Sequence, residues 1–157
     1  MNTTRRKLAL FAAVLGCCGA IQAQRSTEIV KWTAAVSKST GASTSVALSA
    51  TIQNGWHVYA LSQPAGGPTP LKISIPSGAP FALQAPVAET KVTRREDPSF
   101  KMETVFYLNS VSLTLNVKKE GAPTADAVPV DVRFQACNDR LCLPPYTVHL
   151  TADLKSK

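Results

Sequence analysis

Proline and glycine interrupt this chain so often that no stretch carries an apolar stripe of helical period for three turns. The 157 residues include 11 prolines and 8 glycines, and the segments between them tend to alternate apolar with polar side chains. Because successive side chains of a strand point to opposite faces, this alternation is typical of strands with one buried face. The sequence therefore predicts an all-β protein.

Nine short segments either show this alternation or are apolar runs bounded by turn residues. They are residues 30–36, 46–52, 56–61, 71–75, 81–83, 87–92, 111–117, 128–136 and 146–152. Asn54 and Gly55 lie between the second and third of them, and this dipeptide predicts a hairpin. About seven to nine short strands in a chain of this length predict an immunoglobulin-like β-sandwich.

The N-terminus has the layout of a secretory signal peptide. Positive charges at residues 5–7 precede an apolar run at 8–15, and small residues end at Ala23. The run is shorter than the roughly 20 residues that span a bilayer. We therefore expect cleavage after Ala23 and a single exported domain of residues 24–157 without a membrane span. A twin-arginine signal and a lipid anchor on Cys17 stay open as alternatives.

Much of the chain's positive charge belongs to this leader. The formal net charge is +7, and removal of the three leader cations lowers it to +4. The remaining lysines and arginines are scattered among acidic residues and do not form a basic stripe interleaved with aromatic residues. The mature chain is therefore not expected to bind nucleic acid.

Cysteine usage limits the chemistry further. Cys17 and Cys18 leave with the leader, so Cys137 and Cys142 remain as an even pair where disulfides can form. The alternation of residues 128–136 places Cys137 on the polar face, and we expect it to point away from the core. A disulfide across so small a loop stabilises a fold by only about 2 kcal/mol. An outward-facing bond of this kind is suited to exchange with an external thiolate.

Two other uses of the cysteines stay open. One is a structural disulfide in a non-enzymatic binding module of the cell envelope. The other is a copper or zinc carrier, which needs further ligands from His57, His149 or Met102. His149 alternates onto the polar face of the last predicted strand, so we expect it to face solvent. No cofactor is expected.

Four stretches together resemble a known family. They are NGWHVY at residues 54–59, GGPTP at 66–70, EDPSF at 96–100 and FQACNDRLCLPP at 134–145. Their order and separations are similar to those of the N-terminal periplasmic domain of the DsbD-type thiol:disulfide interchange proteins. The resemblance covers nearly the whole mature chain, and the stretch that holds the cysteines is the most specific.

The resemblance implies an immunoglobulin-like domain, expected to be a monomer, that relays electrons by thiol–disulfide exchange. In that family the domain takes electrons from a thioredoxin-like domain, which a membrane-embedded partner feeds. It passes them to periplasmic disulfide isomerases and cytochrome c maturation proteins. The family's full-length chain continues into a membrane domain and a thioredoxin domain, and this sequence stops before either. We therefore expect the membrane-embedded electron donor and the thioredoxin-fold partners to be separate polypeptides.

The resemblance also implies roles for single residues. Cys137 and Cys142 correspond to the redox pair, and Cys142 to the cysteine that forms mixed disulfides. Tyr59 corresponds to a neighbour of the site and Phe100 to a shield over it. Without the resemblance, an aromatic side chain in the charged segment 94–101 is expected to be an anchor in the core. The two interpretations of Phe100 predict different effects of truncation.

Overall fold

Three antiparallel sheets make up the part of the chain that this computed structural model describes, residues 25–89, 91–120 and 125–155. The helix and strands are α1 (Ser26–Ile29), β1 (Val30–Ser39), β2 (Ser43–Ile52), β3 (His57–Tyr59), β4 (Lys72–Ser74), β5 (Phe81–Glu89), β6 (Thr93–Asp97), β7 (Met102–Leu108), β8 (Ser110–Lys119), β9 (Ala127–Phe134), β10 (Ala136–Cys137) and β11 (Tyr146–Asp153). Within these ranges no helix is long and apolar enough to cross a membrane. The predicted signal peptide, residues 1–23, lies outside the described residues.

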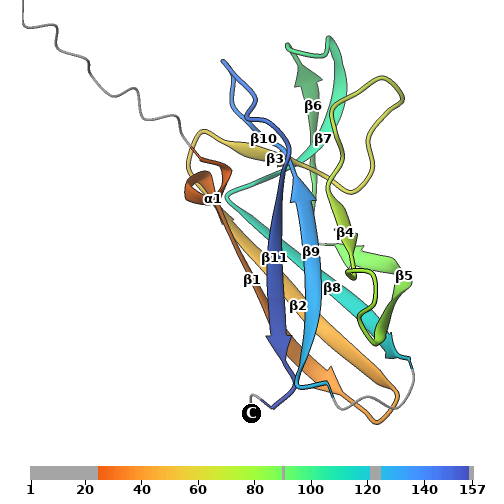
Figure 1. Ribbon diagram of the computed structural model, residues 1–157. Coiled ribbons are helices and arrows are strands. Elements are labelled where there is room, and N and C mark those ends of the chain that lie inside the picture. The colour runs from red at the N-terminus through yellow and green to blue at the C-terminus, as the bar shows by residue number, and fades with distance from the viewer. Residues whose placement is uncertain (1–24, 90, 121–124, 156–157) are drawn as a thin grey trace, which may run out of the picture.

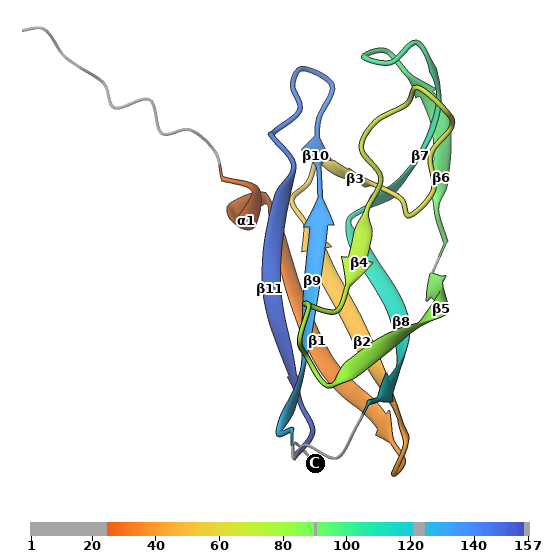
Figure 2. The ribbon, with the colours of Figure 1, turned by 45° about the vertical axis from the view of Figure 1, so that its right-hand side comes forward.

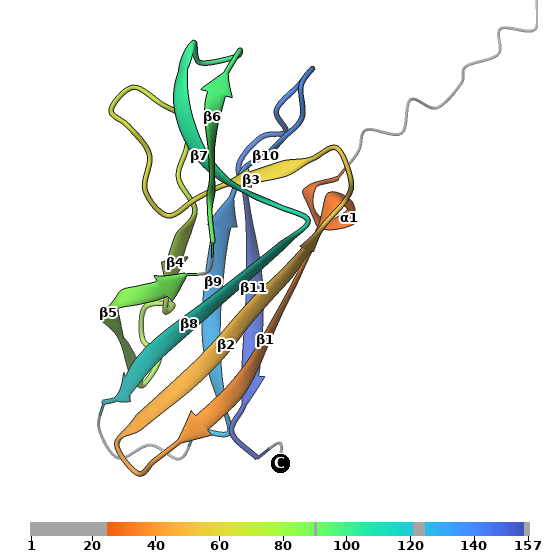
Figure 3. The same cartoon turned by 180° about the vertical axis from the view of Figure 1, so that it is seen from behind.

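The three sheets form a sandwich with an extension at one end. Sheet 1 has the strand order β1-β2-β8-β5, sheet 2 the order β10-β3-β7-β6, and sheet 3 the order β11-β9-β4. Sheets 1 and 3 face each other along the body of the molecule (Figures 1 and 3). Sheet 2 lies at the end opposite the C-terminus, where the β6–β7 hairpin and the loop after β10 both project (Figure 2). Segments far apart in the sequence therefore meet at this end.

The core between sheets 1 and 3 follows the predicted alternation. Every second side chain of β8 and β9 is buried: Val111, Leu113, Leu115, Val117, Val128, Val130, Val132 and Phe134. The ring of Trp32 in β1 packs on Phe134, with ring centroids 5.8 Å apart. Each fully buried side chain of this size contributes about 1.5–3 kcal/mol. These two rows of side chains hold the facing sheets together.

The prediction of a hairpin at Asn54-Gly55 is wrong, although the chain does make a turn there. The amide of Trp56 donates to the Gln53 carbonyl at 3.0 Å, and Gly55 has φ 82° while Asn54 does not have a positive φ. A type I′ hairpin turn needs positive φ at both central residues, whereas a type II turn needs it only at the second. The turn therefore leads the chain out of sheet 1, and β3 pairs with β7 and β10 instead of β2.

The β6–β7 hairpin includes the charged segment 94–101, in which the sequence pattern predicts no strand. Strand β6 is an edge strand whose middle residues are charged and exposed. In β7, residues 104–107 are all buried, because Val105 and Tyr107 join the main core while Phe106 faces the opposite side. Neither strand has the two-residue period of a strand with one buried face. This explains why the alternation of the sequence does not indicate them.

Strand β5 also differs from the prediction. The sequence predicts separate strands at 81–83 and 87–92, but the structure has the single strand β5. Its pairing with β8 shifts register between Gln84 and Ala88. A proline within a run of residues is compatible with an edge strand or a bulge, and β5 is an edge strand of sheet 1. The break that the prolines predict is therefore a local irregularity of one strand.

A pair of leucine variants tests this description of the core. Leu115 in β8 is fully buried, whereas Leu108 at the end of β7 is 43% exposed. We expect Leu115→Ala to lower the free energy of unfolding by about 2–5 kcal/mol, because truncation leaves a cavity. Leu108→Ala is the matched control and should cost about 1 kcal/mol or less. Denaturant unfolding measures both, and equal losses would contradict the assigned core.

Candidate functional site

The two cysteines form a disulfide at the base of a short hairpin tip. Cys137 ends β10 and is bonded to Cys142, with Cα atoms 4.0 Å apart. The amide of Asn138 donates to the Leu141 carbonyl at 2.9 Å. The side-chain oxygen of Asn138 accepts bonds from the amides of Arg140 and Leu141, each at 2.9 Å. The tip, residues 138–141, is thus held in a closed turn that brings the cysteines together.

The prediction that Cys137 faces solvent is wrong. Cys137 is only 1% exposed. The reason is that β9 ends at Phe134 and the chain then enters sheet 2, where Cys137 pairs with His57. Cys137 lies outside the main core and packs with Tyr59 and Phe106 in a second apolar cluster, here called the site cluster. Cys142 is only partly buried against this cluster. The two sulfur-bearing residues therefore have different access to solvent.

A turn between β6 and β7 covers the site cluster, and the buried Asp97 holds this turn in place. The Asp97 carboxylate accepts a hydrogen bond from the Tyr59 hydroxyl at 2.7 Å and one from the Ser99 amide at 2.9 Å. The Asp97 carbonyl accepts bonds from the amides of Phe100 and Lys101 at 3.2 and 2.7 Å. These bonds fix residues 98–101, here called the cap turn, to strand β3.

The cap turn places Phe100 against the site cluster. Its ring meets that of Tyr59 edge to face, with centroids 5.9 Å apart. Phe100 is partly buried and packs on the cluster that contains Cys137, and it is not among the residues that pack on the main core. This position is compatible with the predicted shield, whose role remains a prediction.

The pKa values of Asp97 and Tyr59 favour this hydrogen bond. Burial acts to raise the pKa of Asp97, but the bonds donated by the Tyr59 hydroxyl and the Ser99 amide outweigh it, and the pKa is lowered. Burial and the Asp97 carboxylate raise the pKa of Tyr59 well above its usual value. At neutral pH Asp97 is therefore an ionised acceptor and Tyr59 a protonated donor.

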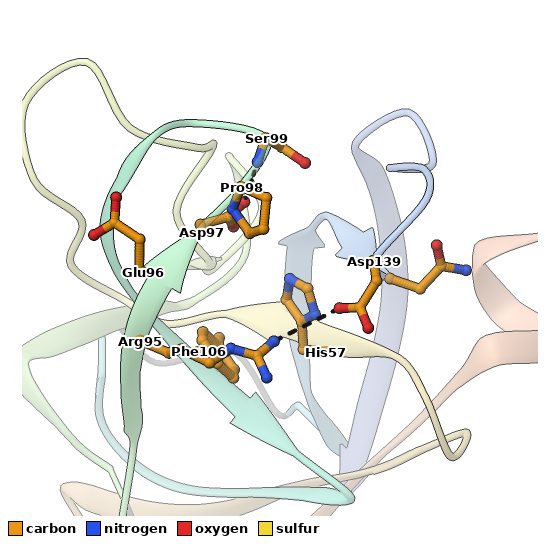
Figure 4. A pocket seen from close by; sticks show the side chains of 9 residues that line it. His57, Arg95, Glu96, Asp97, Pro98, Ser99, Phe106 and Asp139 are labelled. Atoms are coloured by element: carbon orange, nitrogen blue, oxygen red, sulfur yellow. Dashed lines mark hydrogen bonds and ion pairs between the residues drawn. The ribbon is translucent and has the colours of Figure 1, made fainter.

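His57 lies beside the disulfide, opposite Cys137 in the pairing of β3 with β10. Its ring contacts those of Tyr59 and Phe106, with centroid distances of 5.1 and 4.8 Å. The Arg95 guanidinium lies over the Phe106 ring at 5.3 Å and pairs with Asp139 of the tip at 3.7 Å. Both partners of this ion pair are exposed, so it adds little stability. Figure 4 shows His57 pointing into a small pocket between Arg95 and Asp139.

The structure thus brings together the four residues that the sequence singles out: Cys137, Cys142, Tyr59 and Phe100. His149 lies elsewhere, on β11, where its exposed side chain bonds Asp131 at 2.6 Å as expected for a solvent-facing histidine. In the described part of the chain, no group of three or more His, Cys, Asp or Glu side chains is placed to hold a metal ion.

Two contributors to the site were not identified from the sequence. Phe106 lies in β7, a strand that the alternation does not indicate. The sequence pattern therefore does not predict that Phe106 belongs to the site cluster. Asp97 lies within the EDPSF stretch, but an acidic residue in a charged segment is normally exposed. Its burial follows from the hydrogen bond to Tyr59, a contact between β3 and β6 that only the fold creates.

Truncation of Phe100 separates a shield from a core anchor. We expect Phe100→Ala to change the free energy of unfolding by less than about 1.5 kcal/mol, and to speed alkylation of the reduced cysteines severalfold because the site cluster is uncovered. Phe81→Ala, in the main core and outside the site cluster, is the control and should cost about 3–5 kcal/mol. An equally large loss for Phe100→Ala with an unchanged alkylation rate would favour the anchor.

Comparison with known proteins identifies the family. The family model described as thiol:disulfide interchange protein DsbD, N-terminal, matches residues 26–153. No curated protein sequence matches the chain. Among solved structures, the fold is similar to that of the N-terminal domain of DsbD from Neisseria meningitidis in the reduced form. The TM-score is 0.56 and the sequence identity 12%, over 83% of this chain and 89% of that chain.

A second similar structure is the N-terminal periplasmic domain of ScsB from Proteus mirabilis. The TM-score is 0.55 and the identity 18%, over 80% of this chain and 45% of that chain. The likeness to these structures confirms the all-β, immunoglobulin-like fold class. Since the family model covers most of the sequence, the chain belongs to the family of DsbD N-terminal domains, which are thiol–disulfide exchange domains.

Proposed function

We propose that this chain is a periplasmic electron carrier in which the Cys137–Cys142 disulfide is reduced by one thiol partner and then reduces another. One observation carries the proposal: the disulfide closes a hairpin tip and lies in a separate apolar cluster under the cap turn, outside the core that holds the sheets together. A disulfide in this position contributes little to the sandwich, and the partial exposure of Cys142 supports contact with another protein.

The unequal burial of the two cysteine residues supports one order of the exchange steps. An incoming thiolate attacks the sulfur of Cys142, the less buried residue, and the bond to Cys137 breaks as its sulfur leaves with the electron pair. A second thiolate of the partner then attacks the partner's own sulfur in the mixed disulfide and releases Cys142 as a thiolate. The partner is oxidised by two electrons and the pair is reduced. The reverse sequence passes the electrons on.

The proposed partners are thioredoxin-fold proteins and a membrane-embedded electron donor, as in the family that the chain resembles, and the surroundings of Cys142 support docking of another protein. Leu141, next to Cys142 in the tip, is 47% exposed, and an exposed apolar side chain beside a reacting sulfur gains from burial against a partner. The predicted signal peptide supports export to the periplasm.

The alternative of a structural disulfide is weakened by the size of the loop. Cross-linking so few residues removes little entropy from the unfolded chain, which limits the stabilisation to about 2 kcal/mol. The turn is also closed by hydrogen bonds of its own backbone and of the Asn138 side chain. The sandwich core does not include either cysteine.

Single cysteine variants test the carrier role. We expect Cys137→Ala and Cys142→Ala each to abolish reduction of a thioredoxin-fold disulfide, and to lower the free energy of unfolding by about 2 kcal/mol. Cys137→Ala should accumulate a mixed disulfide through Cys142, whereas Cys142→Ala serves as its control and should trap little. A loss above about 4 kcal/mol for either variant would identify a structural disulfide. Trapping through Cys137 alone would reverse the assigned roles.

A further inference from the structure

His57 occupies the strand position directly opposite Cys137. The two residues are register partners in the antiparallel pair of β3 and β10. Side chains of such partners lie on the same face of the sheet, with Cβ atoms about 4.5–5.5 Å apart. Both side chains are buried, and His57 contacts the Tyr59 and Phe106 rings that form the site cluster around Cys137. The imidazole is therefore a neighbour of the buried sulfur.

One nitrogen of this imidazole has no hydrogen-bond partner. His57 is 7% exposed, and its Nε2 atom is buried without a partner among the described residues. Leaving a buried polar atom unpaired costs free energy, so such atoms in native proteins usually have a role or a transient partner. The Tyr59 hydroxyl donates its only proton to Asp97, so it cannot donate one to this nitrogen. A reduced Cys137 on the facing strand is the candidate donor.

Charged groups from strand β6 and from the tip surround His57. Burial is the largest influence and lowers the pKa of the imidazole below 6.5. The carboxylates of Asp97 at the end of β6 and Asp139 in the tip act to raise the pKa, and the Arg95 guanidinium of β6 acts to lower it. At neutral pH the ring is consequently uncharged and free to accept a proton, while the two carboxylates lie close enough to stabilise the imidazolium that results.

We propose that His57 accepts the proton of the Cys137 thiol when this sulfur resolves a mixed disulfide held on Cys142. The Cys137 S–H bond breaks, the proton moves to the imidazole, and the resulting thiolate attacks the Cys142 sulfur. The disulfide between the two cysteines forms, the bond from Cys142 to the partner breaks, and the partner leaves as a thiolate with the electron pair. The pair loses two electrons and the partner gains them. This inference rests on the proposed function.

The burial of Cys137 is the reason why such an acceptor matters. Only the thiolate is nucleophilic, and an apolar environment raises the pKa of a buried thiol. With the residue 1% exposed, solvent has little access to its proton. An imidazole on the facing strand removes the proton locally, and the imidazolium offsets the charge of the thiolate. His57 also lines a small pocket with Arg95 and Asp139, which is the proposed route of the proton to solvent.

Glutathione disulfide is a probe that isolates this step. Its reaction with the fully reduced chain first places glutathione on Cys142, and the attack of Cys137 then releases it. Acid quenching and mass spectrometry give the rate of release at each pH. The variant His57→Phe keeps an aromatic ring against Tyr59 and Phe106 but cannot accept a proton. His149→Phe changes the other of the two histidines, which is exposed on β11, and is the matched control.

We expect release to slow about 10²-fold in His57→Phe at pH 7, as for loss of a general base. In the wild type and in His149→Phe, the rate should fall as the pH drops through the lowered pKa of His57, and this inflection should be missing in His57→Phe. His57→Gln, which keeps a polar group, should be equally slow and serves if His57→Phe does not fold, as judged by its denaturant midpoint.

Two results would overturn the inference in different ways. Wild-type rate and pH dependence in a folded His57→Phe variant would reject a proton acceptor at this position and leave the carrier role intact. A wild-type chain that binds glutathione on Cys142 but never releases it through Cys137 would reject both the inference and the exchange mechanism on which it rests.

Discussion

The buried hydrogen bond from the Tyr59 hydroxyl to the Asp97 carboxylate organises one end of this molecule. It joins β3 to the end of β6, and the same Asp97 holds the cap turn through its carboxylate and its carbonyl. Phe100 reaches the site cluster because this turn is fixed. A buried carboxylate is costly unless it is fully bonded, so the cap turn and the ionised state of Asp97 depend on each other.

The fold separates the sandwich core from the apolar cluster that holds the disulfide. The large core between sheets 1 and 3 holds the sandwich together, whereas the site cluster consists of Tyr59, Phe106 and Cys137 with Phe100 and Cys142 against it. Regions with few buried apolar contacts open at low free-energy cost. In the proposed exchange, the site would therefore rearrange around a partner while the sandwich stays intact. This separation fits the low sequence identity to the structures with a similar fold, because sandwiches tolerate many apolar substitutions.

Much of the fold follows from the alternation of side chains, which correctly indicates β1, β2, β8, β9 and β11. It fails where a strand lacks one buried and one exposed face. Both faces of β7 are buried, β6 is a charged edge, and Cys137 is buried on what appears as a polar face because the chain changes sheets after Phe134. The stretches that resemble the family contain Tyr59, Asp97, Phe100 and both cysteines. The contacts among them depend on three-dimensional pairing that local patterns do not encode.

The reduction potential of the Cys137–Cys142 pair tests the carrier role most directly. The wild-type chain is equilibrated with glutathione buffers of known potential, and the fraction of the disulfide is measured after acid quenching. Because the loop is small and Cys142 is accessible, we predict a value between about −270 and −120 mV, the range of thioredoxin-fold oxidoreductases with which it would exchange electrons. A value below about −300 mV, typical of structural disulfides in secreted proteins, would contradict the carrier role.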